Sequence, residues 1–245
     1  MKSALPGLLG DANLVPQLVQ AVRDVVRVEI RSALTEQELL RLSALVEAIA
    51  RDLDLYDNLS SSTRSRDVGV IDNALTNASA AMSLSAKYPL LGAHVLSASF
   101  SLRLIALHAK DKARKDKGWI ETAKSENKET ASRLTSSITE YSRLMKPDNR
   151  LTKVDCGSRE VPISRHADGG TNTLYHCGFQ IDGRPNGNEQ SYNRSTAERR
   201  TEERRQSVLA RISAEEARGQ KEFVEPLNAT IQKWDDAIVL WGRSR

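Results

Sequence analysis

Aromatic residues and cysteines are both scarce in this chain. Tryptophan, tyrosine and phenylalanine make up 4% of the 245 residues, and there are 2 cysteines. So few aromatics argue against an aromatic-rich β-sandwich and suit helices packed with Leu, Val, Ile and Ala. Two cysteines are also too few for the disulfide framework of a small secreted domain.

A secretory signal and a strong charge of one sign are missing as well. Pro6, Gly7 and Asp11 interrupt the first apolar residues, which leaves no adequate apolar segment for a signal peptide. We therefore expect a soluble protein, whose release or secretion would use no recognisable signal peptide. Lys and Arg number 36 and Asp and Glu 32, a mild surplus of interspersed charge. This surplus permits attraction to anionic membranes or nucleic acid but demands neither, and we expect no nucleic-acid partner.

Most of the chain shows the three- and four-residue spacing of apolar side chains that predicts amphipathic helices. Thr35-Glu36-Gln37-Glu38 forms a capping box at one helix start, and Pro147 and Pro226 end two others. The predicted helices cover residues 14–34, 36–59, 68–87, 88–110, 119–145, 195–223 and 227–241. A hydrophobic content of 39% and a charged content of 28% are those of a globular protein, long enough for one domain or two small ones.

Residues 148–192 differ from the rest of the chain. Pro, Asp-Gly, Gly-Gly and Asn-Gly signals mark turns around two short strand-like runs. Tyr175, Cys177, Phe179 and Ile181 alternate with more polar residues, so one strand has an apolar face. This pattern predicts an inserted β-hairpin.

The predicted fold is therefore all-α with one β insertion. We expect a bundle of six to seven helices around a central hydrophobic helix at 88–110, with the hairpin inserted near 155–185. The predicted domains are a helical bundle core at 1–147, the insertion at 148–192, and C-terminal helices at 193–245 that pack on the bundle.

Two cysteines and two histidines in the insertion raise the question of a metal site. Cys156, His166, His176 and Cys177 suit a tetrahedral zinc ion in residue type, but their spacing is wrong for the common zinc fingers. His176 and Cys177 are adjacent on a predicted strand, so their side chains point to opposite faces. We expect no metal here.

A disulfide between Cys156 and Cys177 is a competing interpretation. If Val161 and Ile163 share a face with Tyr175 and Cys177, then Cys156 points to the other face unless a bulge intervenes. The bond would also need an oxidising compartment. We therefore expect two free thiols.

No pattern in the sequence assembles a catalytic site. Asp168 or Asp182 could join a Cys/His pair, but nothing places these groups together, and there is no nucleophile elbow or phosphate-binding glycine loop. Gly169, Gly170 and Gly183 are better explained as turn formers. The arginines near residues 199–211 interleave with glutamates, as on a solvated helix face, with a partner helix or an anionic lipid surface as the alternative. We expect no enzymatic activity and no cofactor.

The most apolar stretch of its length is YPLLGAHVLSASFSLRLIALHAK, residues 88–110. The segment from Pro89 to Leu107 could just cross a hydrocarbon core of about 30 Å at about 1.5 Å per residue. Against this, Arg103 near its middle costs on the order of 3 kcal/mol in a membrane. The stretch is therefore either the buried centre of a soluble bundle or a helix that is buried first and inserts after a trigger.

A thin polar stripe and a broad apolar surface divide this predicted helix. The stripe consists of four residues at spacings of three, four and seven, namely His94, Ser97, Ser101 and His108. The residues that we predict to enter a membrane are Pro89, Leu90, Leu91, Val95, Leu96, Phe100, Leu104 and Leu107. In an inserted state the stripe would face water or partner helices. Its two histidines offer a pH sensor, against the ordinary alternative of histidines satisfied within the fold.

Several motifs follow one another in the order of a known family. VRDVVRVEIRSALTEQELLRLSALVEAIARDLDLY is similar in layout to a helix of the type L-x-x-Q-I followed by a short A-L-x-x-L-x-G-L segment. DNALTNASAAM stands where the family has N-S-A-L, and YPLLGAHVLSASFSLRLIALHAKDK where its central helix begins Y-x-V-P-L-L. Trp119 opens the next helix, and LTSSITEY is similar to a T-x-x-I-x-x-Y element. Over residues 18–145 the chain thus resembles the helical N-terminal, pore-forming domain of the three-domain insecticidal crystal toxins, the δ-endotoxins.

This resemblance implies a toxin-like pore-forming or membrane-perturbing protein that acts on target-cell membranes. Its central helix would insert with a neighbouring helix as a hairpin, and oligomers would line a pore. The implied partners are target membrane lipids and a protein receptor or partner subunit. The chain departs from the family in its β insertion, in lacking the asparagine-rich signature of the central helix, and in lacking the receptor-binding β domains.

A second hypothesis comes from a different functional class. The chain would be a soluble, non-enzymatic helical scaffold or adaptor. It would bind a protein partner through its charged C-terminal helix or through the β-hairpin.

Overall fold

The structure is a computed structural model that describes residues 36–60, 63, 68–90, 92–114, 118–162 and 171–243. Some sequence predictions fall outside these residues. They concern the helix over 14–34, the capping residue Thr35, Leu91, and the loop 163–170 with His166 and Asp168.

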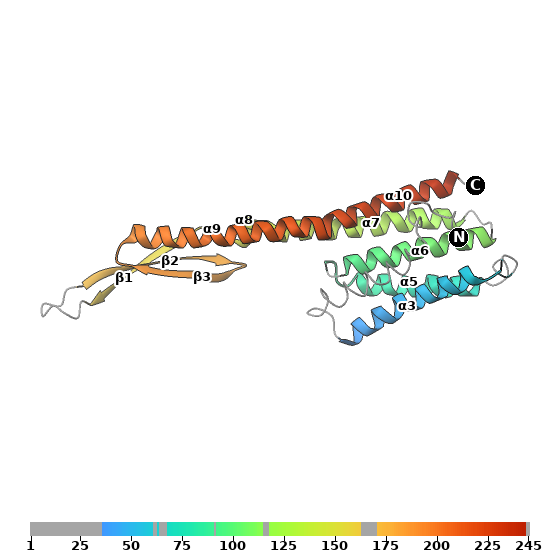
Figure 1. Cartoon of the computed structure of the whole chain (residues 1–245), viewed down its shortest axis with the longest axis horizontal. Coiled ribbons are helices and arrows are strands. Elements are labelled where there is room, and N and C mark those ends of the chain that lie inside the picture. Colours follow the sequence, from blue (N-terminus) through green and yellow to red (C-terminus); the bar gives the residue numbers. More distant parts are fainter. Residues whose placement is uncertain are drawn as a thin grey trace. The chain divides into compact units, whose positions relative to one another are not determined.

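The described part of the chain is mainly helical with one small antiparallel sheet, which confirms the predicted class (Figure 1). The helices are α3 (Glu36–Asn58), α5 (Gly69–Ser85), α6 (Ala93–Arg114), α7 (Gly118–Met145), α8 (Pro147–Arg150), α9 (Arg194–Gly219), the π-helix η2 (Gln220–Val224) and α10 (Glu225–Arg243). The strands are β1 (Asp155–Pro162), β2 (Thr171–Ile181) and β3 (Arg184–Ser191).

The chain divides into two compact units. The helical unit comprises Met1–Thr139 and Glu225–Arg245, and the β unit comprises Glu140–Val224. The first boundary falls inside α7, and the second falls between η2 and α10. Each unit has its own buried residues.

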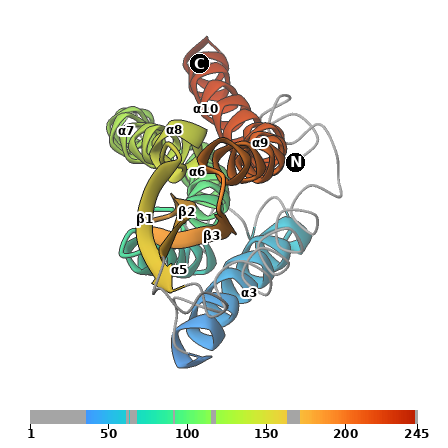
Figure 2. The same ribbon diagram turned by 90° about the vertical axis from the view of Figure 1, so that its left-hand side faces the viewer.

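Within the helical unit, α6 lies between α3 and α5 on one side and α7 and α10 on the other (Figure 2). Every residue from Ala93 to Ala109 is buried, apart from His94 and Arg103, which are half-buried. The face of α5 toward this core carries small residues at helical spacing, Ala74, Ala78 and Ala81. Small side chains let two helix backbones approach closely, so α5 and α6 pack against each other along much of their length.

The start of α6 differs from the prediction. The sequence predicts a helix from residue 88 with Pro89 in its first turn, whereas the helix begins at Ala93. The preceding residues form turns, in which the Gly92 N–H donates to the Tyr88 carbonyl at 2.6 Å. A Cβ at Gly92 would lie 2.1 Å from the Ser85 carbonyl oxygen, so the chain passes through a space that glycine alone can occupy.

Pro226 also acts differently from the prediction. Instead of breaking the helical backbone, it lies in the first turn of α10. The π-helix η2 directly precedes this turn, so helical backbone continues from α9 into α10. The sequence predicted a helix end at this proline and gave no sign of the π-helical turn.

The β unit contains three antiparallel strands in the order β1-β2-β3, one more than the predicted hairpin. Asp182 and Gly183 join β2 to β3 with φ angles of 50° and 74°, as in the two-residue turns that suit a twisted hairpin. A bulge follows between Cys177 and Phe179. It places Gly187 at a φ of 73°, where a Cβ would lie 3.2 Å from the Phe179 ring.

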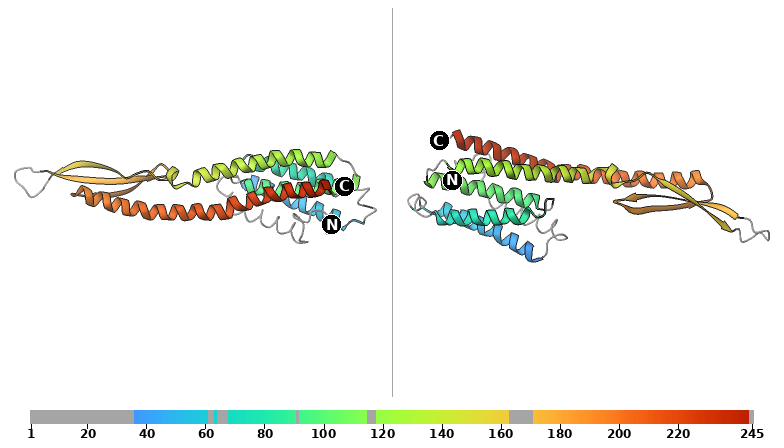
Figure 3. Two further views of the ribbon diagram at one scale, coloured as in Figure 1. Left: turned by 90° about the horizontal axis from the view of Figure 1, so that it is seen from above. Right: turned by 180° about the vertical axis from the view of Figure 1, so that it is seen from behind.

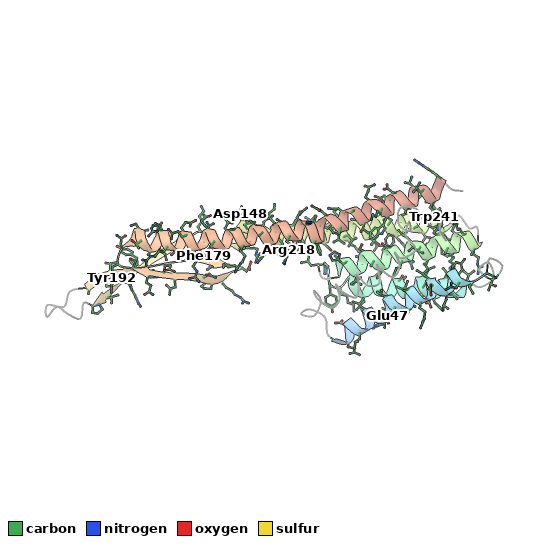
Figure 4. The ribbon with its side chains drawn as sticks, viewed as in Figure 1. Glu47, Asp148, Phe179, Tyr192, Arg218 and Trp241 are labelled. Atoms are coloured by element: carbon green, nitrogen blue, oxygen red, sulfur yellow. A yellow bond between two sulfur atoms is a disulfide. The ribbon has the colours of Figure 1, made fainter. Side chains whose placement is uncertain are left out.

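Helix α9 packs on β2 and β3 and buries the apolar face of the sheet (Figure 3). Phe179, labelled in Figure 4, forms a core cluster with Leu151 and Ile212. At the other end of α9, the rings of Tyr141 and Phe223 stack with their centres 4.3 Å apart. The Asn193 side chain accepts a hydrogen bond from the Thr196 N–H at 3.2 Å and caps the start of α9.

Candidate functional site

The predicted membrane-insertion residues on α6 are core residues of the helical unit. Five of the eight are at most 4% exposed, namely Val95, Leu96, Phe100, Leu104 and Leu107. Pro89 is exposed and Leu90 is half-buried in the turn before the helix, and Leu91 lies outside the described residues. The apolar surface of α6 is therefore covered by its neighbours rather than by solvent.

The polar stripe of α6 faces α10. The Trp234 indole N–H donates to the Ser101 hydroxyl at 2.9 Å, and Ser101 donates in turn to the Ser97 carbonyl at 3.0 Å. The His108 ring meets the Trp241 ring edge-on, with centres 5.0 Å apart. Ser101 and His108 are seven residues apart on α6, and their partners Trp234 and Trp241 are seven residues apart on α10. The two helices therefore run parallel.

Two further contacts reinforce this α6–α10 interface. The Trp241 indole N–H donates to the Asp111 carboxylate at 2.9 Å. The Trp234 ring also meets Phe100 edge-on, with ring centres 4.7 Å apart. Ser101 and His108 of the stripe are thus buried against α10, Ser97 is buried as well, and His94 is half-buried at the start of the stripe.

Arg103, the charged residue in the middle of α6, is bound by two neighbouring helices. Its guanidinium donates to both carboxylate oxygens of Glu126 on α7, at 2.5 and 2.6 Å. It also donates to the Ser79 hydroxyl at 2.8 Å and the Leu75 carbonyl at 2.9 Å on α5. A bidentate arginine–carboxylate pair of this kind is among the stronger polar contacts in proteins. Arg103 therefore holds α5, α6 and α7 together.

Within the described residues, no helix combines the length and the apolar character that a membrane crossing requires.

The prediction of two free thiols is wrong, because Cys156 and Cys177 form a disulfide. The two residues are direct partners in the β1–β2 register, with Cα atoms 4.1 Å apart. The prediction assumed that Val161 shares a face with Tyr175 and Cys177. In the structure Val161 pairs with Asn172, so it lies on the opposite face, and Cys156 shares the face of Cys177.

The disulfide lies on the covered face of the sheet, and a histidine lies on the other. Cys177 is buried, and its carbonyl accepts a hydrogen bond from the Thr201 hydroxyl of α9 at 3.3 Å. His176 is exposed on the outer face, opposite Gly157. A Cβ at Gly157 would lie 2.5 Å from Nε2 of His176, so the imidazole lies directly over the glycine. Within the described residues, no group of three or more His, Cys, Asp or Glu could hold a metal ion.

The edge strand β1 is the most exposed element of the sheet. Six of its eight residues are exposed and the other two are half-buried. One side of β1 pairs with β2, and within the described residues no strand pairs with its other side. The disulfide ties this exposed strand to the strand that α9 covers.

Ion pairs fix the segments that lead into and out of the sheet. Arg150 of α8 donates to the Asp182 carboxylate at 3.0 Å and to Glu215 of α9 at 2.9 Å. The hydrogen bond from Arg150 lowers the pKa of Asp182, and the same bond raises the pKa of Arg150. Arg205 donates to the Thr152 carbonyl at 2.8 Å, so this arginine of the charged α9 face connects α9 to the segment that leads into β1.

Sequence reasoning did not find these partners. Trp234 and Trp241 lie seven residues apart on one helix, and this spacing matches that of Ser101 and His108. That match is a signal which could have paired the two helices. No local pattern marks Arg150 as the tie between the sheet and α9.

A scan against protein-family models, a search of curated proteins and a search of solved structures each found no match for this chain.

Proposed function

We propose that this chain is a non-enzymatic adaptor that binds a protein partner through its β unit. The observation that carries the proposal is the exposed edge strand β1, fixed by a disulfide to a strand that α9 covers. The alternative contact surface, the charged face of α9, is less suited, because several of its arginines pair with glutamates or tie the unit together.

An exposed sheet edge is a ready template for a further strand. Backbone N–H and C=O groups on the outer side of β1 have no strand partner among the described residues. An extended peptide that adds to such an edge gains main-chain hydrogen bonds, while alternate side chains give selectivity. Arg159 and Glu160 are both exposed on β1 and lie on opposite faces of the sheet. A partner strand would therefore meet a charge of one sign on each face.

The disulfide supports this role by ordering β1 in advance. A flexible edge loses conformational freedom when it binds, and that loss reduces affinity. Cys156 lies near the start of β1, and the pairing of the strand runs from there to Pro162. Because the cross-link limits the motion of β1 before binding, the partner does not need to order the strand.

Photo-crosslinking from β1 tests the proposal. The photoreactive residue p-benzoylphenylalanine replaces Arg159 on β1 and, in matched controls, Lys128 on α7 or Ser207 on α9. All three positions are exposed. Irradiation of cells that produce these variants should give protein adducts mainly from the β1 position. Replacing both cysteines by alanine should reduce the yield of these adducts. Equal adduct yields from all three positions, or none from β1, would contradict the proposal.

A membrane-perturbing function is the second candidate, and the composition of α6 favours it. Between Ala93 and Ala109, Arg103 is the one residue of the Asp, Glu, Lys and Arg classes. In this proposal α3, α5, α7 and α10 form a bundle around α6 until pH, proteolysis or lipid contact releases it. The helix would then insert with α5 or α7 as a hairpin, as the resemblance to the insecticidal crystal toxins implies. Oligomers would line a pore in the target-cell membrane.

Release of α6 would first have to break its polar contacts. These are the bonds from Arg103 to α5 and α7 and the two indole hydrogen bonds from α10. Glu126→Gln weakens the first set, and Glu129→Gln is a matched control, because Glu129 lies exposed on the same helix. Dye release from vesicles after a pH shift or limited proteolysis should be faster for Glu126→Gln and unchanged for the control. Absence of release from wild type under every condition would exclude this candidate.

A further inference from the structure

Four helix ends meet at one end of the helical unit. Lys110 of α6 forms an ion pair with Asp72 of α5, and its ammonium lies 4.1 Å from the centre of the Trp119 ring of α7. The α6–α10 bond between Asp111 and Trp241 lies at the same end. Figure 4 labels Trp241 there. The start of α7 closes the group, because a Cβ at Gly242 of α10 would lie 3.4 Å from Ile120.

This end carries positive charges that have no anionic partner among the described residues. Lys112, Arg114 and Arg243 are exposed and make no hydrogen bond or ion pair within the part of the chain that the structure describes. Two acidic residues that the structure describes at this end are already engaged. Asp72 pairs with Lys110, and Asp111 is buried and accepts from an indole.

The helix ends account for part of this charge. The C-termini of α6 and α10 each carry about half a negative charge, which a lysine or arginine in the last turn offsets. Three exposed cations exceed what these two helix ends can neutralise. The surplus is available to an external anion.

Two exposed aliphatic side chains accompany the cations. Val239 is 51% exposed and Leu240 is 42% exposed. They precede Arg243 by four and three residues, so all three lie on the same side of α10. Cations beside exposed aliphatic groups are typical of surfaces that lie on anionic membranes, because the charges attract the headgroups and the aliphatic groups enter the interface. Nucleic acid would use the cations but would offer nothing to the aliphatic pair.

We propose that this cationic end, formed by Lys112, Arg114, Arg243, Val239 and Leu240, docks on an anionic lipid surface. The docking is peripheral, requires no helix to cross the bilayer, and is independent of partner binding by the β unit. Each cation near an anionic membrane contributes about a fivefold gain in partitioning. Neutralising all three should therefore weaken binding by about 100-fold.

Vesicle co-sedimentation of the full chain tests this proposal. The probes are vesicles of phosphatidylcholine alone and of phosphatidylcholine with about 30% phosphatidylserine. Wild type should bind the second kind and not the first, and added salt should weaken the binding because it screens the charges. Lys112→Gln/Arg114→Gln/Arg243→Gln should lose about 100-fold in partitioning. Val239→Ser/Leu240→Ser should also lose affinity while the salt dependence remains.

A second triple variant controls for net charge. Lys128, Lys146 and Arg200 are exposed elsewhere in the chain, and changing them to Gln removes the same charge. This control should bind the anionic vesicles within about threefold of wild type. The proposal is overturned if wild type does not bind these vesicles or if the control loses as much as the test variant. Binding of the cationic end to nucleic acid instead of vesicles would overturn it too. Circular dichroism confirms that each variant is folded, and all the altered residues are exposed.

Discussion

Removing the Cys156–Cys177 cross-link should loosen β1 and leave the helical unit intact. The two cysteines are 21 positions apart, and closing a loop of that length stabilises a fold by about 3 kcal/mol in the chain-entropy model. This free energy corresponds to about a 150-fold change in the opening equilibrium. In Cys156→Ala/Cys177→Ala, the amides of β1 should therefore exchange hydrogen with solvent up to about 150-fold faster. Hydrogen exchange measured by mass spectrometry over residues 155–162 gives the rates.

Two controls separate the cross-link from other effects. Wild type with its disulfide reduced keeps both sulfur atoms, so its β1 exchange should accelerate as in the double variant. Tryptophan fluorescence reports on the helical unit alone, because Trp119, Trp234 and Trp241 all lie in it, and the urea midpoint of this signal should not move. A β1 exchange rate within about threefold of the oxidised protein would refute the reasoning, since strand pairing alone would then hold β1.

Three further changes test single contacts. Arg103→Leu should lower the free energy of unfolding of the helical unit by about 2–3 kcal/mol, because its acceptors on α5 and α7 lose their donor. An unchanged urea midpoint of tryptophan fluorescence would contradict this. Gly219→Ala should cost the β unit about 1–3 kcal/mol, because the new methyl group overlaps the Tyr141 hydroxyl. Tyr141→Phe should recover part of that loss in hydrogen exchange, and no recovery would count against the overlap. Because Arg150 lowers the pKa of Asp182, their pair stabilises the fold above the ordinary carboxyl pKa of 3.8, and this contribution is lost as pH falls through the lowered pKa. Asp182→Asn should remove this acid dependence from urea unfolding followed by circular dichroism, and a variant that keeps it would exclude the pair as its source.

Local spacing predicted where the helices lie but not which surfaces cover them. The burial of α6 could be predicted, because apolar residues occupy almost the whole circumference of the helix. The helix that packs on its polar stripe could not be predicted, since Trp234 is 133 positions from Ser101 in the sequence. Hydroxyl and imidazole groups on a helix are compatible with water, a pore or a buried donor, and only the fold distinguishes these cases.

The sheet shows a different limit of the sequence. The parity argument against the disulfide failed at one residue, because Val161 was assumed to point toward the core by its apolar character alone. On a short edge strand a half-buried valine on the outer face costs little, so hydrophobicity does not fix the register. The third strand was missed for a related reason. RPNGNEQS has no apolar alternation, and its pairing with β2 follows from the two-residue turn at Asp182 and Gly183.

The central claim is that β1 is the recognition edge. It is tested most directly by the hydrogen exchange of β1 with and without the partner protein, identified by photo-crosslinking from position 159. Strand addition would pair the outward amides of β1, so their exchange should slow when the partner is added. The amides of α3, in the helical unit, should keep their rates. Slowed exchange at β1 alone is the result that the account predicts. Unchanged exchange at β1, with protection appearing elsewhere in the described chain, would contradict it.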